Sequence, residues 1–193
     1  MHSFVEKIAK AMAVIGGLVL TMLIVLTCIS VTGRGINTFS HWAWFETTFP
    51  GLSASLIETG VGPILGDFEL VEAGIAFAIF SFLPICQLHS SHATVDVFTS
   101  MLPKQAELWL KALWEVVFAV VIILIAVKLY DGMSSKIRNG ETTFLLQFKV
   151  WWSYALSLLA AMVAALVAVY CALVRIKGAV AHQEVLTGEG AVH

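Results

Sequence analysis

The chain has 193 residues, of which 59% are hydrophobic and 12% charged, and its formal net charge is −2. Soluble domains carry about 25% charged residues, so this low charge content excludes a water-soluble globular surface and indicates an integral membrane protein. The slightly acidic balance also argues against a nucleic-acid-binding protein, because such proteins need a basic face.

The first apolar run covers residues 11–33 and is bounded by Lys10 and Arg34. At 1.5 Å per residue its 23 residues span about 34 Å, slightly more than the hydrocarbon core of a bilayer at about 30 Å. A cleaved signal peptide has a shorter apolar core and a cleavage site of small residues. We therefore expect a retained transmembrane helix over residues 11–33.

Three further apolar runs predict transmembrane helices over about 70–88, 108–130 and 150–174. The third has a short uncharged core, and Lys111 and Glu115 lie four residues apart on one face of its first turns. They either pair with each other, or Lys111 extends to the lipid headgroups. The fourth run is uncharged and has one side of small residues, which allow close helix approach in lipid: Ala160, Ala161, Ala164, Ala165 and Ala168.

Two segments between these runs have features of the membrane interface. Residues 34–68 are rich in aromatic rings, which gather at the headgroup level, and we expect an interfacial loop there. Residues 93–103 place Val95, Phe98 and Met101 on one face, which predicts a short in-plane amphipathic helix. The expected fold is an all-α integral membrane protein, a single domain over residues 1–193 with four transmembrane helices.

Four crossings place both termini on the same side of the membrane. The 11 Lys and Arg residues divide almost evenly between the two sides, so the positive-inside rule gives little bias. Lys7 and Lys10 before the first helix, and the acidic segment after it, favour cytoplasmic termini, whereas the loop 128–149 favours the opposite orientation. We expect cytoplasmic termini.

Ionisable residues within a bilayer mark substrate pathways or proton relays, and the first, second and fourth runs contain none. We therefore expect no catalytic residue, cofactor or metal site. Cys28, Cys86 and Cys171 are far apart and form no redox or zinc motif. His89 and His92 are three residues apart, but no other run supplies a facing histidine, so they are interpreted as interfacial rather than haem-binding.

Residues at the ends of the runs are candidate contacts with a partner or the interface. Glu69 and Glu72 share a face, and they either touch a partner or are first-turn acids favoured by the helix dipole. Lys136 and Arg138 read either as a solvated loop or as a docking patch for an acidic partner surface. The full set is Arg34, Trp42, Trp44, Glu69, Glu72, His92, Asp96, Lys111, Glu115, Lys136, Arg138, Trp151 and Trp152.

Several short motifs occur in a characteristic order over about residues 8–175. Arg34 follows the first run, and Gly-Asp-Phe-Glu at 66–69 opens the second. His-Ala-Thr-Val-Asp at 92–96 and Pro103 precede the third, and Gly-Glu-Thr-Thr at 140–143 leads to the paired tryptophans that open the fourth. The ordered set resembles the small membrane subunit of tripartite ATP-independent periplasmic (TRAP) transporters, the DctQ family, with a longer segment at 34–68.

The resemblance implies a non-catalytic permease subunit in the bacterial inner membrane. Such a subunit scaffolds and anchors a large elevator-type membrane subunit for sodium-coupled uptake of an organic anion, which an extracytoplasmic substrate-binding protein delivers. The implied partners are therefore the large TRAP subunit, that binding protein and membrane lipid, with no nucleic acid and no cofactor. Two alternatives remain open: a four-helix membrane protein linked to a quinone or haem, and a self-assembling small membrane protein.

Overall fold

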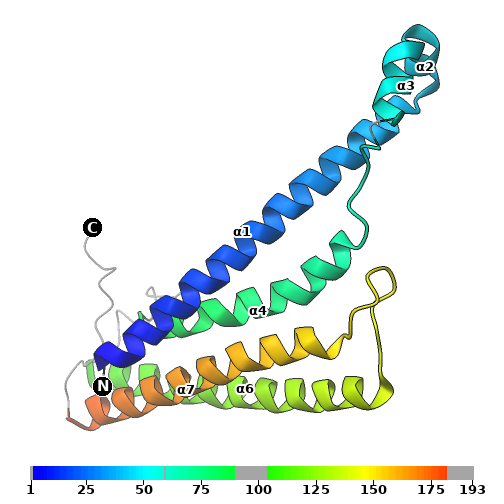
Figure 1. The fold of residues 1–193 in the computed structure, drawn as a ribbon. Helices are drawn as coiled ribbons and strands as arrows, with labels where there is room; N and C mark the ends of the chain where they lie inside the picture. The colour runs from blue at the N-terminus through cyan, green and yellow to red at the C-terminus, as the bar shows by residue number, and fades with distance from the viewer. Residues whose placement is uncertain (1, 59, 90–103, 182–193) are drawn as a thin grey trace.

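The computed structural model describes residues 2–58, 60–89 and 104–181 of the chain, which form four long helices and two short ones (Figure 1). The short helices α2 and α3 form a hairpin at the far end of α1. No strand occurs in this described part. The helices are α1 His2–Ser40, α2 Ala43–Thr48, α3 Pro50–Glu58, α4 Asp67–Leu88, α6 Lys104–Asn139 and α7 Trp151–Ala181.

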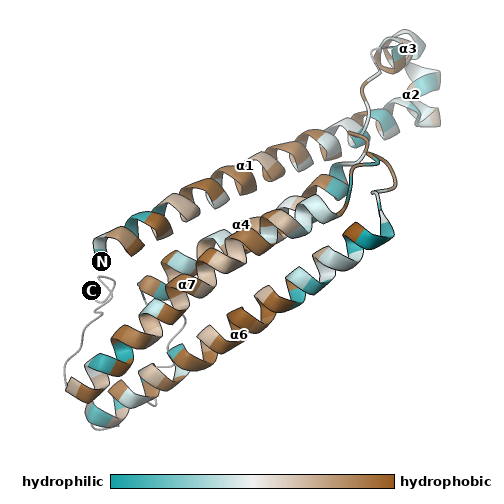
Figure 2. Cartoon of the chain, turned by 60° about the horizontal axis from the view of Figure 1, so that its bottom comes forward, coloured by the Kyte–Doolittle hydropathy of each residue, from teal (hydrophilic) through white to brown (hydrophobic). Residues whose placement is uncertain are grey.

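The four expected transmembrane helices are confirmed. Helices α1, α4, α6 and α7 are each long and apolar enough to cross a membrane, and their apolar middle sections are visible in Figure 2. The N-terminal end of α1 and the C-terminal end of α7 lie at the same end of the molecule (Figure 1). We call this the terminal end, and we call the opposite end, where α1 leads into α2 and α6 connects to α7, the loop end.

Helix α6 extends further than the apolar pattern predicts. It runs through Lys136 and Arg138 to Asn139, so the expectation that these two cations lie in a loop is wrong. Beyond the hydrocarbon region water solvates charged side chains, so Lys136 and Arg138 can lie on a helix at no cost and do not end it. The helix ends where Gly140 takes φ 64°, a left-handed conformation that favours glycine after a helix C-terminus.

The segment 34–68 is also more helical than expected. Helix α1 continues to Ser40, so its 39 residues reach about 58 Å, well beyond the thickness of the hydrocarbon core. The hairpin of α2 and α3 is attached to α1 by Ser53 Oγ, which donates to the Ser40 carbonyl at 2.9 Å. Asn37 Nδ2 donates to the Val61 carbonyl at 3.2 Å. The in-plane helix expected over residues 93–103 lies outside the described residues.

The four long helices lie side by side in the order α1, α4, α7, α6, with α4 between α1 and α7 (Figures 1 and 2). Helix α7 is the most enclosed: 50% of its most apolar window is buried, against 6% for α1. Its small-residue side is buried within this chain, since Ala160, Ala161, Ala164 and Ala168 are at most 2% exposed. The two edge helices, α1 and α6, keep wide apolar faces exposed.

Glycines bring α1 and α4 into close contact. A Cβ added at Gly16 would lie 2.7 Å from Ser81 Cβ, and one added at Gly74 would lie 2.9 Å from Leu23 Cδ1. These glycines therefore allow the close helix approach on which association in lipid depends. Helix α1 is attached to the bundle mainly through this one face.

Candidate functional site

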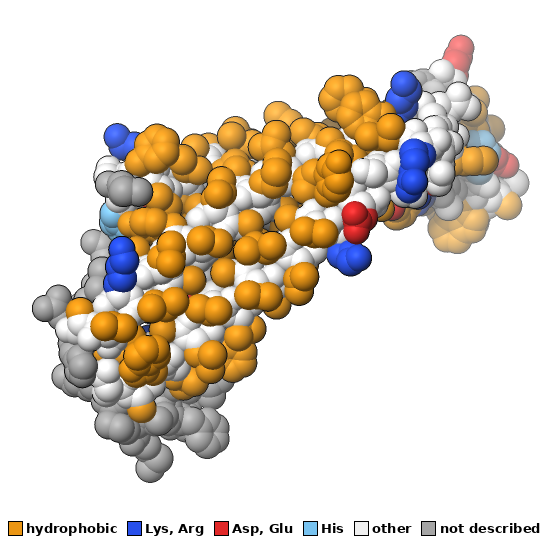
Figure 3. Space-filling view, turned by 90° about the horizontal axis from the view of Figure 1, so that it is seen from below, with side chains coloured by type: hydrophobic (Ala, Val, Ile, Leu, Met, Phe, Trp, Pro, Cys, Tyr) orange, Lys and Arg blue, Asp and Glu red, His pale blue; other side chains and the backbone are white. Residues whose placement is uncertain are grey.

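Charged side chains gather at the two ends of the molecule, and hydrophobic side chains cover the surface between them (Figure 3). Residues 11–33 of α1, 116–127 of α6 and 151–174 of α7 carry no charge. Two clusters of buried or half-buried polar side chains mark the ends of this apolar zone. The cluster toward the terminal end, which we call the terminal layer, consists of Gln87, Glu115 and Arg175. The cluster toward the loop end, which we call the loop layer, consists of Ser30, Arg34 and Asp67.

The terminal layer joins α4, α6 and α7. Arg175 Nε donates to Glu115 Oε1 at 2.9 Å, and Gln87 Nε2 donates to the other carboxylate oxygen. The side chains of Arg175 and Glu115 are only 8% and 10% exposed, and Gln87 is 1% exposed. The carboxylate and the guanidinium neutralise each other, which is the condition for keeping two charges out of water.

The ion pairs around this layer differ from the Lys111–Glu115 pair considered from the sequence. Lys111 Nζ lies 2.7 Å from Glu107 Oε1 on the same helix, and Glu115 bonds across the bundle to α7 and α4 instead. Sequence reasoning missed Gln87 and Arg175 as site residues. The available signal was that Arg175 follows directly after the uncharged fourth run, and that Glu115 directly precedes the uncharged core of the third run.

The loop layer joins α1 to α4. Ser30 Oγ donates to Asp67 Oδ2 at 2.6 Å, and Arg34 Nη2 lies 3.5 Å from the same oxygen. The Phe68 amide donates to Asp67 Oδ1 at 2.8 Å, and the Ile64 amide donates to Ser30 Oγ at 3.2 Å. Asp67 therefore fixes the start of α4 against α1. Ser30 gave no sequence signal because it lies inside an apolar run.

Glu69 connects α4 to the segment between α6 and α7. Its carboxylate accepts the Leu145 amide at 2.6 Å and the Leu146 amide at 2.9 Å. Leu146 also lies against Gly66, where φ is 80° and an added Cβ would be 2.5 Å from Leu146 Cγ. Glu69 is thus satisfied inside the chain, whereas Glu72, one turn later, is exposed.

A second acid stabilises the same connecting segment. Glu141 forms an ion pair with Lys136, and Asn139 Nδ2 donates to Glu141 Oε1 at 3.0 Å. These two partners hold the pKa of the Glu141 carboxyl below its ordinary value. Arg138 is exposed on the last turn of α6.

Tryptophan side chains occur near both polar layers. The rings of Trp151 and Trp152 stack at the start of α7 with centroids 4.6 Å apart. Trp42 and Trp44, also at the loop end, are each 59% exposed, and Trp109 and Trp114 near the start of α6 are 50% and 64% exposed. Because tryptophan prefers the membrane–water interface, these positions indicate one interfacial level at each end of the molecule.

The spacing of the two layers matches a bilayer. Asp67 and Gln87 belong to the two layers and lie twenty residues apart on α4, a rise of about 30 Å, which equals the hydrocarbon thickness.

Two of the candidate contact residues, His92 and Asp96, lie outside the described residues. Among the residues described, no group of three or more His, Cys, Asp or Glu side chains is placed to hold a metal ion.

These features assign different tasks to the ends and the middle of the molecule. The polar groups at the ends bond to one another and fix the helices, while α1 and α6 present apolar faces outward. A bundle of this kind is suited to a constant depth in the membrane and to lateral contact with lipid or another membrane protein.

A comparison with known proteins gives one family match. The family model described as "Tripartite ATP-independent periplasmic transporters, DctQ component" matches residues 23–178. This range begins inside α1, includes α4 and α6, and ends within α7. No curated protein and no solved structure matches the chain.

Proposed function

This chain belongs to the DctQ component family of TRAP transporters, as a small multi-pass membrane subunit, and from that premise we propose that it is a non-catalytic scaffold. In this role it holds a larger, elevator-type membrane subunit at a fixed depth and tilt in the bacterial inner membrane, with its own termini in the cytoplasm. The larger subunit carries an organic anion together with sodium, after an extracytoplasmic binding protein has delivered the anion.

The observation that carries the proposal is the position of the charges. A transporter that strips water from an anion needs polar groups or broken helices near the midplane to replace that water. The middle sections of α1, α6 and α7 are uncharged. Arg34 pairs with Asp67 near the loop end, and Arg175 pairs with Glu115 near the terminal end. The substrate site is therefore assigned to another chain.

The internal bonds support a role as the fixed part. An elevator mechanism requires one element that stays in place while another slides through the bilayer. The terminal layer joins three helices, the loop layer joins α1 to α4, and Glu69 attaches the α6–α7 connection. Exposed tryptophans at both ends fix the depth and tilt of the whole unit.

The experiment that tests a fixed scaffold is a disulfide lock across α1 and α4 in the assembled transporter. In a variant lacking Cys28, Cys86 and Cys171, Gly16→Cys is combined with Ser81→Cys. The Cβ positions lie 2.7 Å apart, so a small outward shift reaches the separation of about 3.8 Å that a disulfide needs. We expect sodium-driven uptake to be the same with the lock oxidised or reduced.

The matched control combines Gly17→Cys with Ser81→Cys. The nearest atom to a Cβ at Gly17 is Phe82 Cζ at 4.0 Å, so this pair also places one cysteine on each of the two helices but without the close approach. Loss of uptake in the oxidised Gly16 lock, restored by a reductant and absent from the control, would show that α1 and α4 move during transport.

A further inference from the structure

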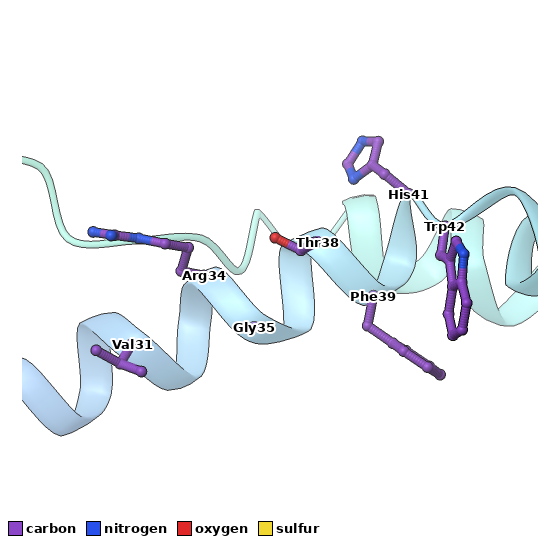
Figure 4. Close-up of a pocket in the computed structure, with 7 residues that line it drawn as sticks. All are labelled: Val31, Arg34, Gly35, Thr38, Phe39, His41 and Trp42. Carbon is purple, nitrogen blue, oxygen red and sulfur yellow. The ribbon is translucent and has the colours of Figure 1, made fainter.

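A groove of about 700 Å³ lies on α1 at the loop end, just beyond the uncharged part of the helix (Figure 4). Arg34, Phe39 and Trp42 are among the residues that line it, and Gly35 lies between them. A Cβ added at Gly35 meets no atom within 4 Å. The glycine therefore leaves an open space on the helix that no other side chain fills.

The groove faces away from α4. Residues 24, 28, 31 and 35 recur at intervals of four, three and four, which places them on one side of the helix. Ser30 and Gly33, which contact α4 and the segment preceding it, lie on the opposite side. Ile24 and Val31 are 55% and 58% exposed. The groove thus continues an exposed apolar stripe that runs toward the middle of the membrane.

Arg34 supplies a cation at the edge of the groove. Its side chain is 49% exposed, and its contact with Asp67 is long, at 3.5 Å. A guanidinium has five N–H donors, so this contact leaves donors for an anion, and arginine binds phosphate oxygens in a favourable planar geometry. On the far side, Trp42 is an aromatic ring of the kind that lies at the headgroup level.

We propose that this groove binds an anionic phospholipid. Its phosphate contacts Arg34 and its acyl chain lies along the stripe that contains Ile24 and Val31. The inference requires only that the chain spans a membrane and is independent of the proposed transporter role.

Position and charge favour a lipid over a neighbouring transmembrane helix. The uncharged residues 11–33 span about the thickness of the hydrocarbon core, so Arg34 lies at the depth of lipid phosphates. A partner helix would have to supply an acceptor for the exposed guanidinium together with apolar side chains for the stripe, whereas an anionic lipid carries both groups in one molecule. A free phosphate would use Arg34 but not the apolar stripe next to it.

The test is native mass spectrometry of the full-length chain in detergent, titrated with phosphatidylglycerol and with phosphatidylcholine of the same acyl composition. We expect about tenfold tighter binding of phosphatidylglycerol, because the choline ammonium of phosphatidylcholine offsets the negative charge of its phosphate and weakens the attraction to Arg34. Arg34→Gln is expected to remove this preference. Because Arg34 also contacts Asp67, a second variant is Gly35→Leu, which adds a side chain to the groove at a position where a Cβ meets no atom within 4 Å; it is expected to abolish the binding.

The control is Gly51→Leu in α3, where an added Cβ also meets no atom within 4 Å; this variant is expected to bind phosphatidylglycerol normally. Equal binding of the two lipids, or normal phosphatidylglycerol binding by Gly35→Leu, would overturn the proposal. Displacement of the lipid by inorganic phosphate alone would assign the groove to a free anion. Loss of co-purification with the large subunit in Gly35→Leu, with lipid binding intact, would assign it to a partner helix.

Discussion

Arg175 Nε donates a hydrogen bond to Glu115 Oε1 at 2.9 Å, and the two side chains are 8% and 10% exposed. The two residues are 60 positions apart in the sequence, each at the edge of an apolar run. Their pairing means that neither helix carries an uncompensated charge toward the bilayer. It also fixes α6 and α7 in one register, because the two groups meet only when the helices are aligned along their length.

Breaking this pair on one side is expected to destabilise the bundle more than removing it entirely. Glu115→Leu and Arg175→Leu are each expected to lower the free energy of unfolding by about 3–5 kcal/mol, because each leaves a buried charge without its main partner. The double variant is expected to recover most of this loss. Unfolding of the purified chain in mixed micelles measures all three.

The control for these variants is Glu107→Gln. The ion pair of Glu107 with Lys111 is 35% and 34% exposed, and such pairs contribute at most about 1 kcal/mol. Losses in the two single variants that simply add in the double variant would contradict a coupled pair.

The close contact between α1 and α4 predicts different tolerance at two adjacent glycines. Gly16→Ala places a methyl group 2.7 Å from Ser81 Cβ, and overpacking of this kind costs about 1–3 kcal/mol. Gly17→Ala places it no closer than 4.0 Å to Phe82 Cζ, so this variant should be at least as stable as the native chain, because alanine favours the helix more than glycine does. Thermal unfolding in detergent compares the two, and equal stability of both variants would show that α1 does not lie against Ser81.

Replacing Glu69 is expected to release the segment between α6 and α7. Glu69→Ala removes the acceptor of the Leu145 and Leu146 amides, so these amides should exchange with deuterium faster. The same measurement on Glu72→Ala is the control, since Glu72 is exposed on the same helix, and it should leave their exchange unchanged. Equal exchange in the two variants would rule out the Glu69 contact.

Glu141 predicts a specific pH dependence. Its partners Lys136 and Asn139 lower the pKa of the folded-state carboxyl below the ordinary value of 4.5. The ionised group therefore contributes stability that is fully present above pH 4.5 and is lost as the pH falls through the lower folded-state pKa. The difference in Tm between the native chain and Glu141→Gln should be visible at neutral pH and disappear in acid. A difference that stays constant with pH would exclude the ion pair as its cause.

The transmembrane helices were predictable because an uncharged apolar run as long as residues 11–33 is typical of a membrane span and rare in a soluble domain. Helix ends were less predictable. Lys136 and Arg138 were assigned to a loop because charged residues mark the limit of the hydrocarbon region. A helix can, however, continue into water until a residue such as Gly140 ends it. The same reason explains why α1 reaches Ser40.

The contacts of the candidate site were mostly not predictable. Glu69 lies in the first turn of α4, as one of its two interpretations predicted. Its partners are backbone amides 76 and 77 residues away, and such contacts leave no side-chain pattern in the sequence. Helical spacing suggested Lys111 as a partner of Glu115. The actual partner, Arg175, could not be predicted, because only the packing of α6 on α7 brings it to Glu115. Spacing rules describe one helix, and these bonds join different helices.

The most direct test of the scaffold role is uptake by proteoliposomes that contain this chain alone, the large subunit alone, or both, each with the binding protein added. Radiolabelled monocarboxylates, dicarboxylates and sugar acids serve as substrates under an imposed sodium gradient. A non-transporting scaffold predicts no uptake by this chain alone and sodium-dependent uptake when both membrane subunits are present. Sodium-dependent uptake by this chain without the large subunit would contradict the account.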